Sequence, residues 1–307
     1  MKTMMNFTTA PEDLGRYASP EDLRRFYRSF GCDGLELMPL PSQDTKPSLP
    51  GTIELSDTIL APDMIVGVHL NCFGDWMYRD RSLLLEHFRR DLDFAQRVQA
   101  EYVVFHVTQV TDEESFTYQM RHTDREVILA ACDLINELLQ GRDYSFYFLM
   151  ENLWWPGLNF LAPSVTKLLL EKVHYEKKGL MLDTGHFLHT NHKLQTQQEA
   201  LVYLHAMLDA HQELIPYIRG IHLQQSLTGD YVEQWLSAPP PLETDPGRRF
   251  CQVFTHIFAI DRHEPFTHPG VKELVERIAP SYLTYEYITR DREEHARLLA
   301  EGTRALK

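Results

Sequence analysis

The stretch "GLMLDTGHFLHT", residues 179–190, joins a short apolar run to a group of polar side chains. The run stops at Asp183, and His186 and His189 follow soon after it. Near-continuous apolar runs of this kind are typical of parallel strands that are buried on both faces. A carboxylate and an imidazole three residues apart, where such a strand ends, raise the question of what they bind.

Seven more apolar runs of similar length are distributed along the chain and alternate with amphipathic segments. The predicted strands are 4–9, 34–39, 64–70, 102–107, 145–151, 179–183, 220–223 and 282–287. The predicted helices are 19–31, 81–99, 124–141, 163–173, 197–215 and 271–279. Eight strands with interleaved helices predict an α/β fold, a (β/α)8 TIM barrel that spans residues 1–307 as a single domain. An open doubly wound sheet is the alternative, but no GxGxxG follows the first strand.

Two connections interrupt this alternation. Residues 40–63 are rich in proline, and residues 224–269 form a long insertion between the seventh and eighth strands. Because long loops in a compact domain are often lids or binding loops, we expect residues 224–260 to fold over the barrel mouth. Arg248, Arg249 or Arg262 could then meet an anionic group of a substrate.

Bulk composition restricts the partners. The chain carries 30 Lys and Arg against 44 Asp and Glu, a net charge of −14, and its basic residues do not cluster. Nucleic acid is therefore an unfavourable partner. Neither a signal peptide nor an apolar stretch of transmembrane length is evident, and the four cysteines are scattered, which favours a cytoplasmic location without a membrane partner. A homo-oligomer is compatible with these features.

Most of the predicted strands end in a residue of a type that binds metal ions. Further residues of this type follow the sixth strand and the long insertion, and the whole set is His69, His106, Glu151, Asp183, His186, His222, Asp261, His263 and Glu286. In a TIM barrel the carboxyl ends of the strands meet at one mouth, and buried carboxylates and imidazoles are costly unless they are paired or bind a metal. Carboxylates with imidazoles and without thiolates predict Zn, Mn, Co or Mg, between one and three ions.

These residues resemble the xylose-isomerase-like superfamily, which includes sugar isomerases, 3-epimerases and the endonuclease IV family. The segments "GCDGLELMP" and "LDTGH" carry the resemblance, which extends over nearly the whole chain. For an epimerase it implies one divalent ion held by Glu151, Asp183, His222 and Glu286. The two glutamates would be the catalytic acid/base pair, and His186 would contact the substrate.

The endonuclease IV branch implies three metal sites on the same barrel. The first would be His69, His106 and Glu151, the second Glu151, Asp183, His222 and Glu286, and the third His186, Asp261 and His263. The segment "DRHEP" resembles the Asp-Arg-His segment of that branch. Two features depart from it, because "EPFTHPG" replaces the Gly-Glu-Gly stretch and the connection from His222 to Asp261 is far longer.

Three functions are compatible with these residues. A metal-dependent isomerase or epimerase of a small sugar is favoured, with Trp154 and Trp155 stacking on the sugar and Arg262 also binding substrate. The alternative is a phosphoester hydrolase with up to three zinc ions, which would activate water and hold the attacking and leaving oxygens. A metal-stabilised binding protein is the non-enzymatic alternative. The acidic charge, the missing nuclease segment and the tryptophans favour the isomerase, although the residues of the third site favour the hydrolase.

Overall fold

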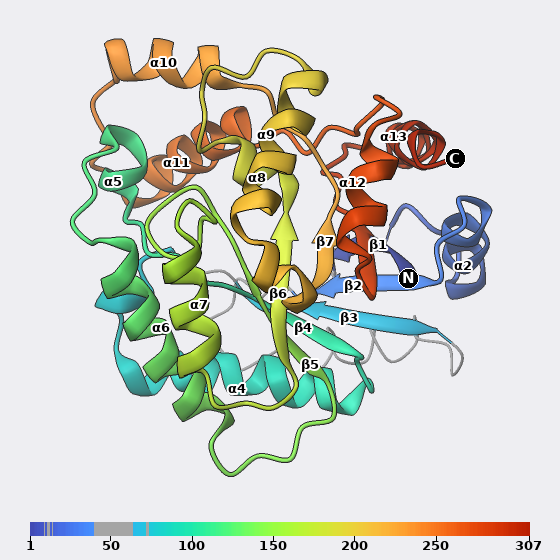
Figure 1. Cartoon of the computed structure of the whole chain (residues 1–307), viewed down its shortest axis with the longest axis horizontal. Helices are drawn as coiled ribbons and strands as arrows, with labels where there is room; N and C mark the ends of the chain where they lie inside the picture. Colours follow the sequence, from blue (N-terminus) through green and yellow to red (C-terminus); the bar gives the residue numbers. More distant parts are fainter. Residues whose placement is uncertain (9, 11–12, 14, 40–63, 72–73) are drawn as a thin grey trace.

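Eight parallel strands lie where the apolar runs predict them and close into a barrel. The computed structural model describes residues 1–8, 10, 13, 15–39, 64–71 and 74–307. The strands are β1 (Lys2–Thr8), β2 (Gly34–Met38), β3 (Ile65–His69), β4 (Tyr102–His106), β5 (Tyr147–Glu151), β6 (Lys178–Asp183), β7 (Ile218–His222) and β8 (Tyr282–Tyr285). They follow one another around the barrel in chain order, and β8 pairs with β1 to close it (Figure 1). The predicted TIM barrel is thus confirmed, and the proline-rich segment 40–63 lies outside the described residues.

Helices surround the barrel, and the first of them begins with the predicted cap. They are α2 (Pro20–Ser29), α4 (Arg81–Arg97), α5 (Asp112–Thr117), α6 (Asp124–Leu139), α7 (Pro163–Lys172), α8 (Thr184–Leu188), α9 (Gln197–Ala210), α10 (Gly229–Ser237), α11 (Pro246–Ile260), α12 (Val271–Ile278) and α13 (Arg292–Ala305), with short 3₁₀ turns at Trp76–Tyr78 and Gln212–Tyr217. Ser19 accepts a hydrogen bond from the Asp22 backbone N–H, and Pro20 occupies the first turn, as predicted for α2. Among the described residues, no helix combines the length and the apolar character needed to cross a membrane.

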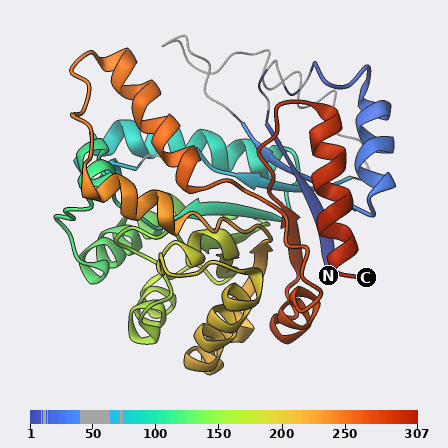
Figure 2. The ribbon, with the colours of Figure 1, turned by 90° about the horizontal axis from the view of Figure 1, so that it is seen from above.

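The insertion between β7 and β8 is largely helical, so the expectation of a long loop is wrong over α10 and α11. Asp245 caps α11 by accepting from the Arg248 N–H, and Pro246 begins the helix. An antiparallel bridge between Gln225 and Glu264 holds the two ends of the insertion together. Seen from above, α10 and α11 extend across the side of the barrel that carries α5 (Figure 2).

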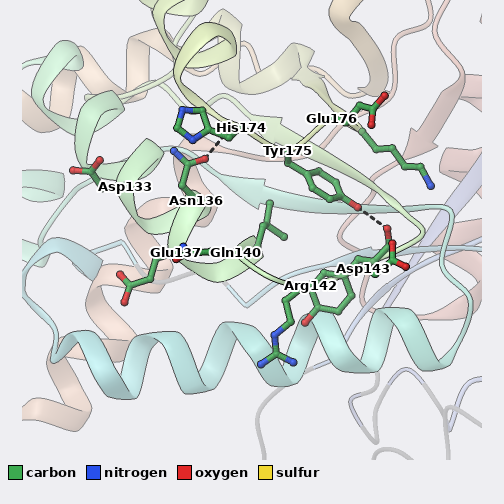
Figure 3. Close-up of a pocket in the computed structure, with 12 residues that line it drawn as sticks. Asp133, Asn136, Glu137, Gln140, Arg142, Asp143, His174, Tyr175 and Glu176 are labelled. Atoms are coloured by element: carbon green, nitrogen blue, oxygen red, sulfur yellow. Dashed lines mark hydrogen bonds between the residues drawn. The ribbon is translucent and has the colours of Figure 1, made fainter.

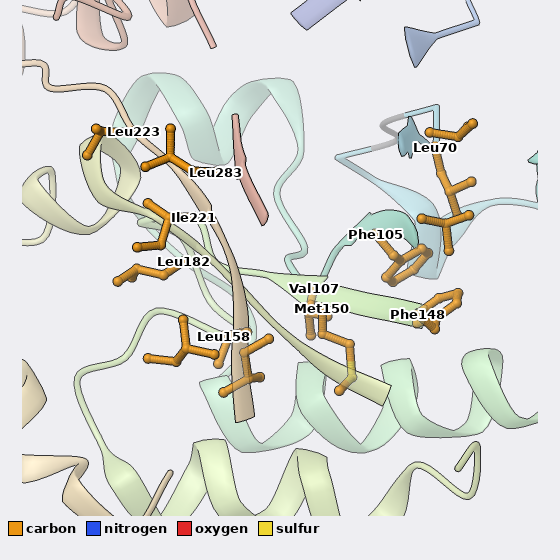
Figure 4. Packing of buried hydrophobic residues seen from close by; sticks show 14 of the residues in the cluster. Leu70, Phe105, Val107, Phe148, Met150, Leu158, Leu182, Ile221, Leu223 and Leu283 are labelled. Atoms are coloured by element: carbon orange, nitrogen blue, oxygen red, sulfur yellow. The ribbon is translucent and has the colours of Figure 1, made fainter. Parts of the chain in front are cut away.

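Alternation along the strands produces two apolar layers. Outward-facing side chains such as Phe105, Phe148 and Leu182 pack against the helices in the main core (Figure 4). The barrel interior has its own small cluster, which consists of Met4, Tyr102, Val104, Leu149, Met181 and Tyr282. Because successive side chains point to opposite faces, the residues two positions beyond this inner cluster also point into the barrel. This register determines which side chains reach the mouth.

A glycine shapes the loops beside the mouth. Gly157 has a φ of +134° and forms an antiparallel bridge to Thr108. A Cβ at Gly157 would overlap the backbone carbonyl oxygen of Val107. The "WWPG" turn after β5 can therefore lie against the loop after β4 only with glycine at this position.

We expect Gly157→Ala to lower the free energy of unfolding by roughly 1–3 kcal/mol, because it combines a strained backbone with a steric overlap. The control is Gly247→Ala, in the first turn of α11, where the nearest atom to a Cβ is Asp245 Oδ1 at 3.4 Å. That control should be neutral or slightly stabilising. Equal urea-unfolding midpoints for Gly157→Ala and the unmodified chain would contradict the predicted overlap.

Candidate metal centre

The residues above the inner cluster of the barrel are the predicted metal ligands. On β4, β5 and β6 the inward-facing Val104, Leu149 and Met181 are each followed two positions later by a residue of ligand type. Those residues are His106, Glu151 and Asp183. The alternation that buries an apolar layer inside the barrel thus places a polar layer directly above it.

The structure brings all nine predicted ligand residues together at this mouth. They form four sets, three of which share residues, and within each set the ligand atoms lie within 4.8 Å of one another. The sets are His69, His106 and Glu151; His69, His222 and Glu286; Glu151, Asp183, His222 and Glu286; and His186, Asp261 and His263. We call the set with His106 the first group, the set with Asp183 the second group and the set with Asp261 the third group.

The first group is organised around one oxygen of Glu151. His69 Nε2 and His106 Nε2 each lie 3.2 Å from Glu151 Oε2. His69 Nδ1 lies 2.9 Å from the backbone oxygen of Leu70, which fixes Nδ1 as the protonated nitrogen. His69 Nε2 therefore carries a lone pair that is directed toward Glu151, where it would bind a metal ion.

The second group is organised around His222 Nδ1. This nitrogen lies 3.1 Å from Glu151 Oε1, 3.2 Å from Glu286 Oε2 and 3.8 Å from Asp183 Oδ2. Glu151 thus directs one carboxylate oxygen to the first group and the other to the second. Asp183 Oδ2 and Glu286 Oε2 are buried and lack a hydrogen-bond partner within the described part of the chain.

The third group joins the end of the insertion to the helix that follows β6. Asp261 Oδ2 lies 3.0 Å from His186 Nε2 and 2.7 Å from His263 Nε2. The Nδ1 atoms of both imidazoles lie within hydrogen-bond distance of backbone oxygens, His186 of Asn152 at 2.9 Å and His263 of Glu286 at 2.8 Å. Imidazoles tethered in this way through one nitrogen are typical of metal ligands.

Glu36 is a member of the site that sequence reasoning missed. It points into the barrel from β2, and its Oε1 lies 2.9 Å from His222 Nε2, close but not aligned as a hydrogen bond. The hydroxyls of Tyr102 and Thr284 donate to its Oε2 over 2.6 and 2.7 Å. The sequence signal that could have identified Glu36 is a single glutamate in the middle of the apolar run "GLELM".

His189 is a second residue near the site whose place the sequence did not reveal. It is buried, and its Nε2 lies 3.5 Å from Asp261 Oδ1, the oxygen that faces away from His186 and His263. It therefore contacts Asp261 on the side of the carboxylate that is opposite the other two residues of the third group.

The donor set fits a divalent cation. Four carboxylates and five imidazoles converge here, and most of these side chains are buried, with Glu286 12 % and His106 19 % exposed. Burying carboxylates in an apolar surrounding is costly unless a positive charge offsets them, and Asp183 and Glu286 each present an oxygen without a partner among the described residues. Nitrogen and oxygen donors of this kind suit zinc, manganese or cobalt.

The pKa values of these groups reflect burial and the close approach of carboxylates and imidazoles. Burial raises the pKa of the Asp183 carboxyl to about 7, and neighbouring carboxylates add to the rise. Burial would lower the pKa of His263, but the Asp261 carboxylate more than offsets it and raises the pKa to about 9. Burial would likewise raise the pKa of Glu151, but the His222 and His106 imidazoles bring it well below its usual range. The proton on His263 Nε2 would have to leave when a metal ion binds there, while the proton on Nδ1 stays in its hydrogen bond to the Glu286 backbone oxygen.

The residues predicted to bind substrate occupy different environments. Trp154 is partly buried, and its ring centroid lies 5.4 Å from that of His186 and 4.7 Å from that of His189. Trp155 is buried in a small cluster with Val110 and Leu153. The Arg262 guanidinium is exposed and lies 4.0 Å from the Glu264 carboxylate.

The insertion packs against α5 on one side of the mouth. Arg249 Nε donates to Asp112 over 2.7 Å, and Trp235 Nε1 donates to the Phe116 carbonyl over 3.1 Å. The α11 residue Ile257 packs on the cluster that contains Trp155. The end of the insertion, at Asp261 and His263, is part of the third group itself.

A surface cleft at the other end of the barrel is separate from this centre. It has a volume of about 590 Å³ and is lined by the end of α6 and by the loops that precede β5 and β6 (Figure 3). Two hydrogen bonds join its lining residues, since Asn136 Oδ1 accepts from the His174 N–H and the Tyr175 hydroxyl donates to the Tyr144 carbonyl. The cleft lies at the amino-terminal ends of the strands, where barrel residues usually serve stability.

Comparison with known proteins supports the fold. A family model described as a xylose isomerase-like TIM barrel matches residues 25–307. No curated protein matches the chain in sequence. Solved structures that resemble it include endonuclease IV from Thermus thermophilus, with 15% identity, a TM-score of 0.60, and coverage of 100% of this chain and 99% of that one.

Two other solved structures cover the same length. A D-tagatose 3-epimerase-like protein has 14% identity and a TM-score of 0.52, over 100% of this chain and 98% of that one. The IOLI protein with a binding zinc atom has 14% identity and a TM-score of 0.54, over 100% and 95%. At these identities the likeness concerns the fold alone.

We expect the metal-free chain, reconstituted with zinc, to bind three ions, and the His263→Ala variant to bind two, because the third group loses a donor. His192→Ala is the matched control, since His192 lies outside all the ligand sets and pairs with Glu233 over 2.8 Å. It should retain three ions. Native mass spectrometry measures these stoichiometries, and one ion per chain in the unmodified protein would contradict the three-group interpretation.

Proposed function

The chain belongs to the xylose isomerase-like TIM barrel family, and we propose that it is a hydrolase of a small phosphoester with a multinuclear divalent-metal centre. The observation that carries this proposal is the third group. A mononuclear isomerase needs only the second group, whereas His186, Asp261 and His263 supply a further complete set of donors beside it. Of the two activities the sequence allows, the geometry thus favours hydrolysis.

In such a reaction the residues of the centre would have different roles. Divalent ions, when bound, would acidify a water molecule and offset the charge on phosphoryl oxygens. Glu151 would bridge the first and second groups, since its two oxygens face different groups. Glu286, the most exposed of the four carboxylates, would lie where substrate enters. Hydrogen bonds from His69, His186 and His263 to backbone oxygens keep their Nε2 atoms directed inward.

The surface favours a small substrate over nucleic acid. A net charge of −14 without basic clusters opposes the binding of a phosphate backbone. The insertion with α10 and α11 lies along one side of the mouth, where it would act as a lid and restrict access. Endonuclease IV, by its name, cuts nucleic acid, and this chain would share its fold while acting on a small phosphoester.

A sugar isomerase or 3-epimerase is the second candidate, and the second group favours it. Glu151 and Glu286 lie at 3.1 and 3.2 Å from the same atom, His222 Nδ1, so both carboxylates would lie beside a single ion, as an acid/base pair. His186 would then contact the substrate, and Trp154 and Trp155 would form part of its pocket. One of the similar structures is a D-tagatose 3-epimerase-like protein.

Activity on model substrates distinguishes the two. We expect the zinc-loaded chain to hydrolyse bis(p-nitrophenyl) phosphate, and His263→Ala to lower the rate by about 100-fold or more, because electrostatic stabilisation from the third group is lost. His192→Ala should leave the rate unchanged.

Hydrogen exchange is the counter-test. If the chain exchanges the carbon-bound hydrogen of D-tagatose or D-fructose in heavy water, retains that activity in His263→Ala, and leaves the phosphodiester intact, the hydrolase proposal is wrong and the epimerase is supported.

A further inference from the structure

The amide of Gln224 lies between carboxylates that belong to two different ligand groups. Its Nε2 donates to Asp183 Oδ1 over 2.9 Å and to Asp261 Oδ1 over 3.2 Å. The side chain is fully buried, just beyond the end of β7. A primary amide carries two N–H donors, so this one group satisfies both carboxylates.

The oxygens that Gln224 binds are the outer ones of each carboxylate. Asp183 Oδ2 has no hydrogen-bond partner in the described part of the chain and faces His222. Asp261 Oδ2 faces His186 and His263. By holding the outer oxygens, the amide leaves the inner oxygens directed toward the second and third groups.

The chain is built to keep this amide in place. The Thr184 hydroxyl holds the backbone of Gln224 on both sides. It donates to the Gln224 backbone carbonyl over 2.6 Å and accepts from the Gln224 backbone N–H over 3.2 Å. A Cβ at Gly185 would overlap the Gln224 side-chain amide. Ser226 Oγ lies 3.2 Å from both Gln224 Oε1 and Asp261 Oδ1. Every residue of "DTGH" therefore serves the centre, either as a ligand or by accommodating Gln224.

We propose that Gln224 is a positioning residue that couples the second and third groups, so that metal ions in the two groups bind interdependently. The inference rests on the proposed multinuclear centre. Without the amide, each of the two buried carboxylate oxygens would lose a donor that it shares with the other, and only the local donors would remain, the His186 backbone N–H at Asp183 Oδ1 and Ser226 Oγ at Asp261 Oδ1. Nothing would then hold the two carboxylates relative to each other, and both would leave the orientation that ions require. The contacts of Gln224 go to the second and third groups, so the ion of the first group is expected to remain.

The test is zinc titration of the metal-free full chain by calorimetry, with native mass spectrometry to count the ions. Gln224→Met removes both donors at nearly constant volume. Gln225→Met is the matched control, since Gln225 is also buried but donates to Glu264 Oε2 over 3.3 Å. We expect Gln224→Met to weaken two of three binding steps by roughly 10- to 100-fold, and Gln225→Met to leave all three within about twofold.

The outcomes separate this inference from the proposed function. If the unmodified chain binds fewer than two ions, the multinuclear centre is wrong. If it binds three and Gln224→Met binds them with unchanged affinity, or loses all three steps equally, the coupling role is wrong while the centre stands.

A second measurement applies if Gln224→Met does not fold. Gly185→Ala should lower the melting temperature of the metal-free chain, and the loss should be much smaller in a Gln224→Ala background, where the space for a Cβ is free. An equal loss in both backgrounds would overturn the proposed packing of the amide against Gly185.

Discussion

The concentration of buried negative charge at one end of the barrel is the constraint on which the rest of this site depends. Glu36, Glu151, Asp183 and Asp261 are all buried, and Glu286 is nearly so. Carboxylates in an apolar interior are tolerated only when donors or cations compensate them. Imidazoles, hydroxyls and one amide compensate some of their oxygens, and two inner oxygens remain without a partner among the described residues. This arrangement is expected of a metal-binding site, whereas a purely structural core would not leave buried carboxylate oxygens without a partner.

The barrel produces this concentration through the geometry of its strands. Side chains alternate between the helix-facing core and the barrel interior, and all strands end at the same mouth. Because the strands share this alternation, the apolar side chains inside the barrel form one layer, and the ligand-type side chains two residues further along the strands form a polar layer at the mouth. The connections after the strands supply the third group, because His186, Asp261 and His263 all lie beyond strand ends. The end of the insertion thus supplies two residues of the third group, Asp261 and His263, while its helices α10 and α11 lie along one side of the mouth.

The fold, and the gathering of the nine ligand-type residues at one mouth, could be predicted from the sequence because both depend on local patterns. Apolar runs define strands, and residues such as Asp183 and His222 stand where those runs end. Glu36 was missed because it lies within a strand, and its role depends on the register that only the closed barrel determines. Gln224 was missed because an amide is not a ligand type, and its function arises from two carboxylates far apart in the chain. The helices α10 and α11 were obscured by the prolines around them, and the exposed position of Arg262 depends on how the insertion packs.

Membership of the family restricts the candidate reactions but does not distinguish between them. A xylose isomerase-like barrel is compatible with both candidate reactions, so the choice depends on how many ions the mouth holds and where. The most direct measurement is the anomalous scattering of zinc-loaded crystals at the zinc edge. We expect one peak enclosed by Glu151, Asp183, His222 and Glu286, and further peaks at the first and third groups. Zinc-loaded crystals without a peak inside the second group would contradict the proposed metal centre.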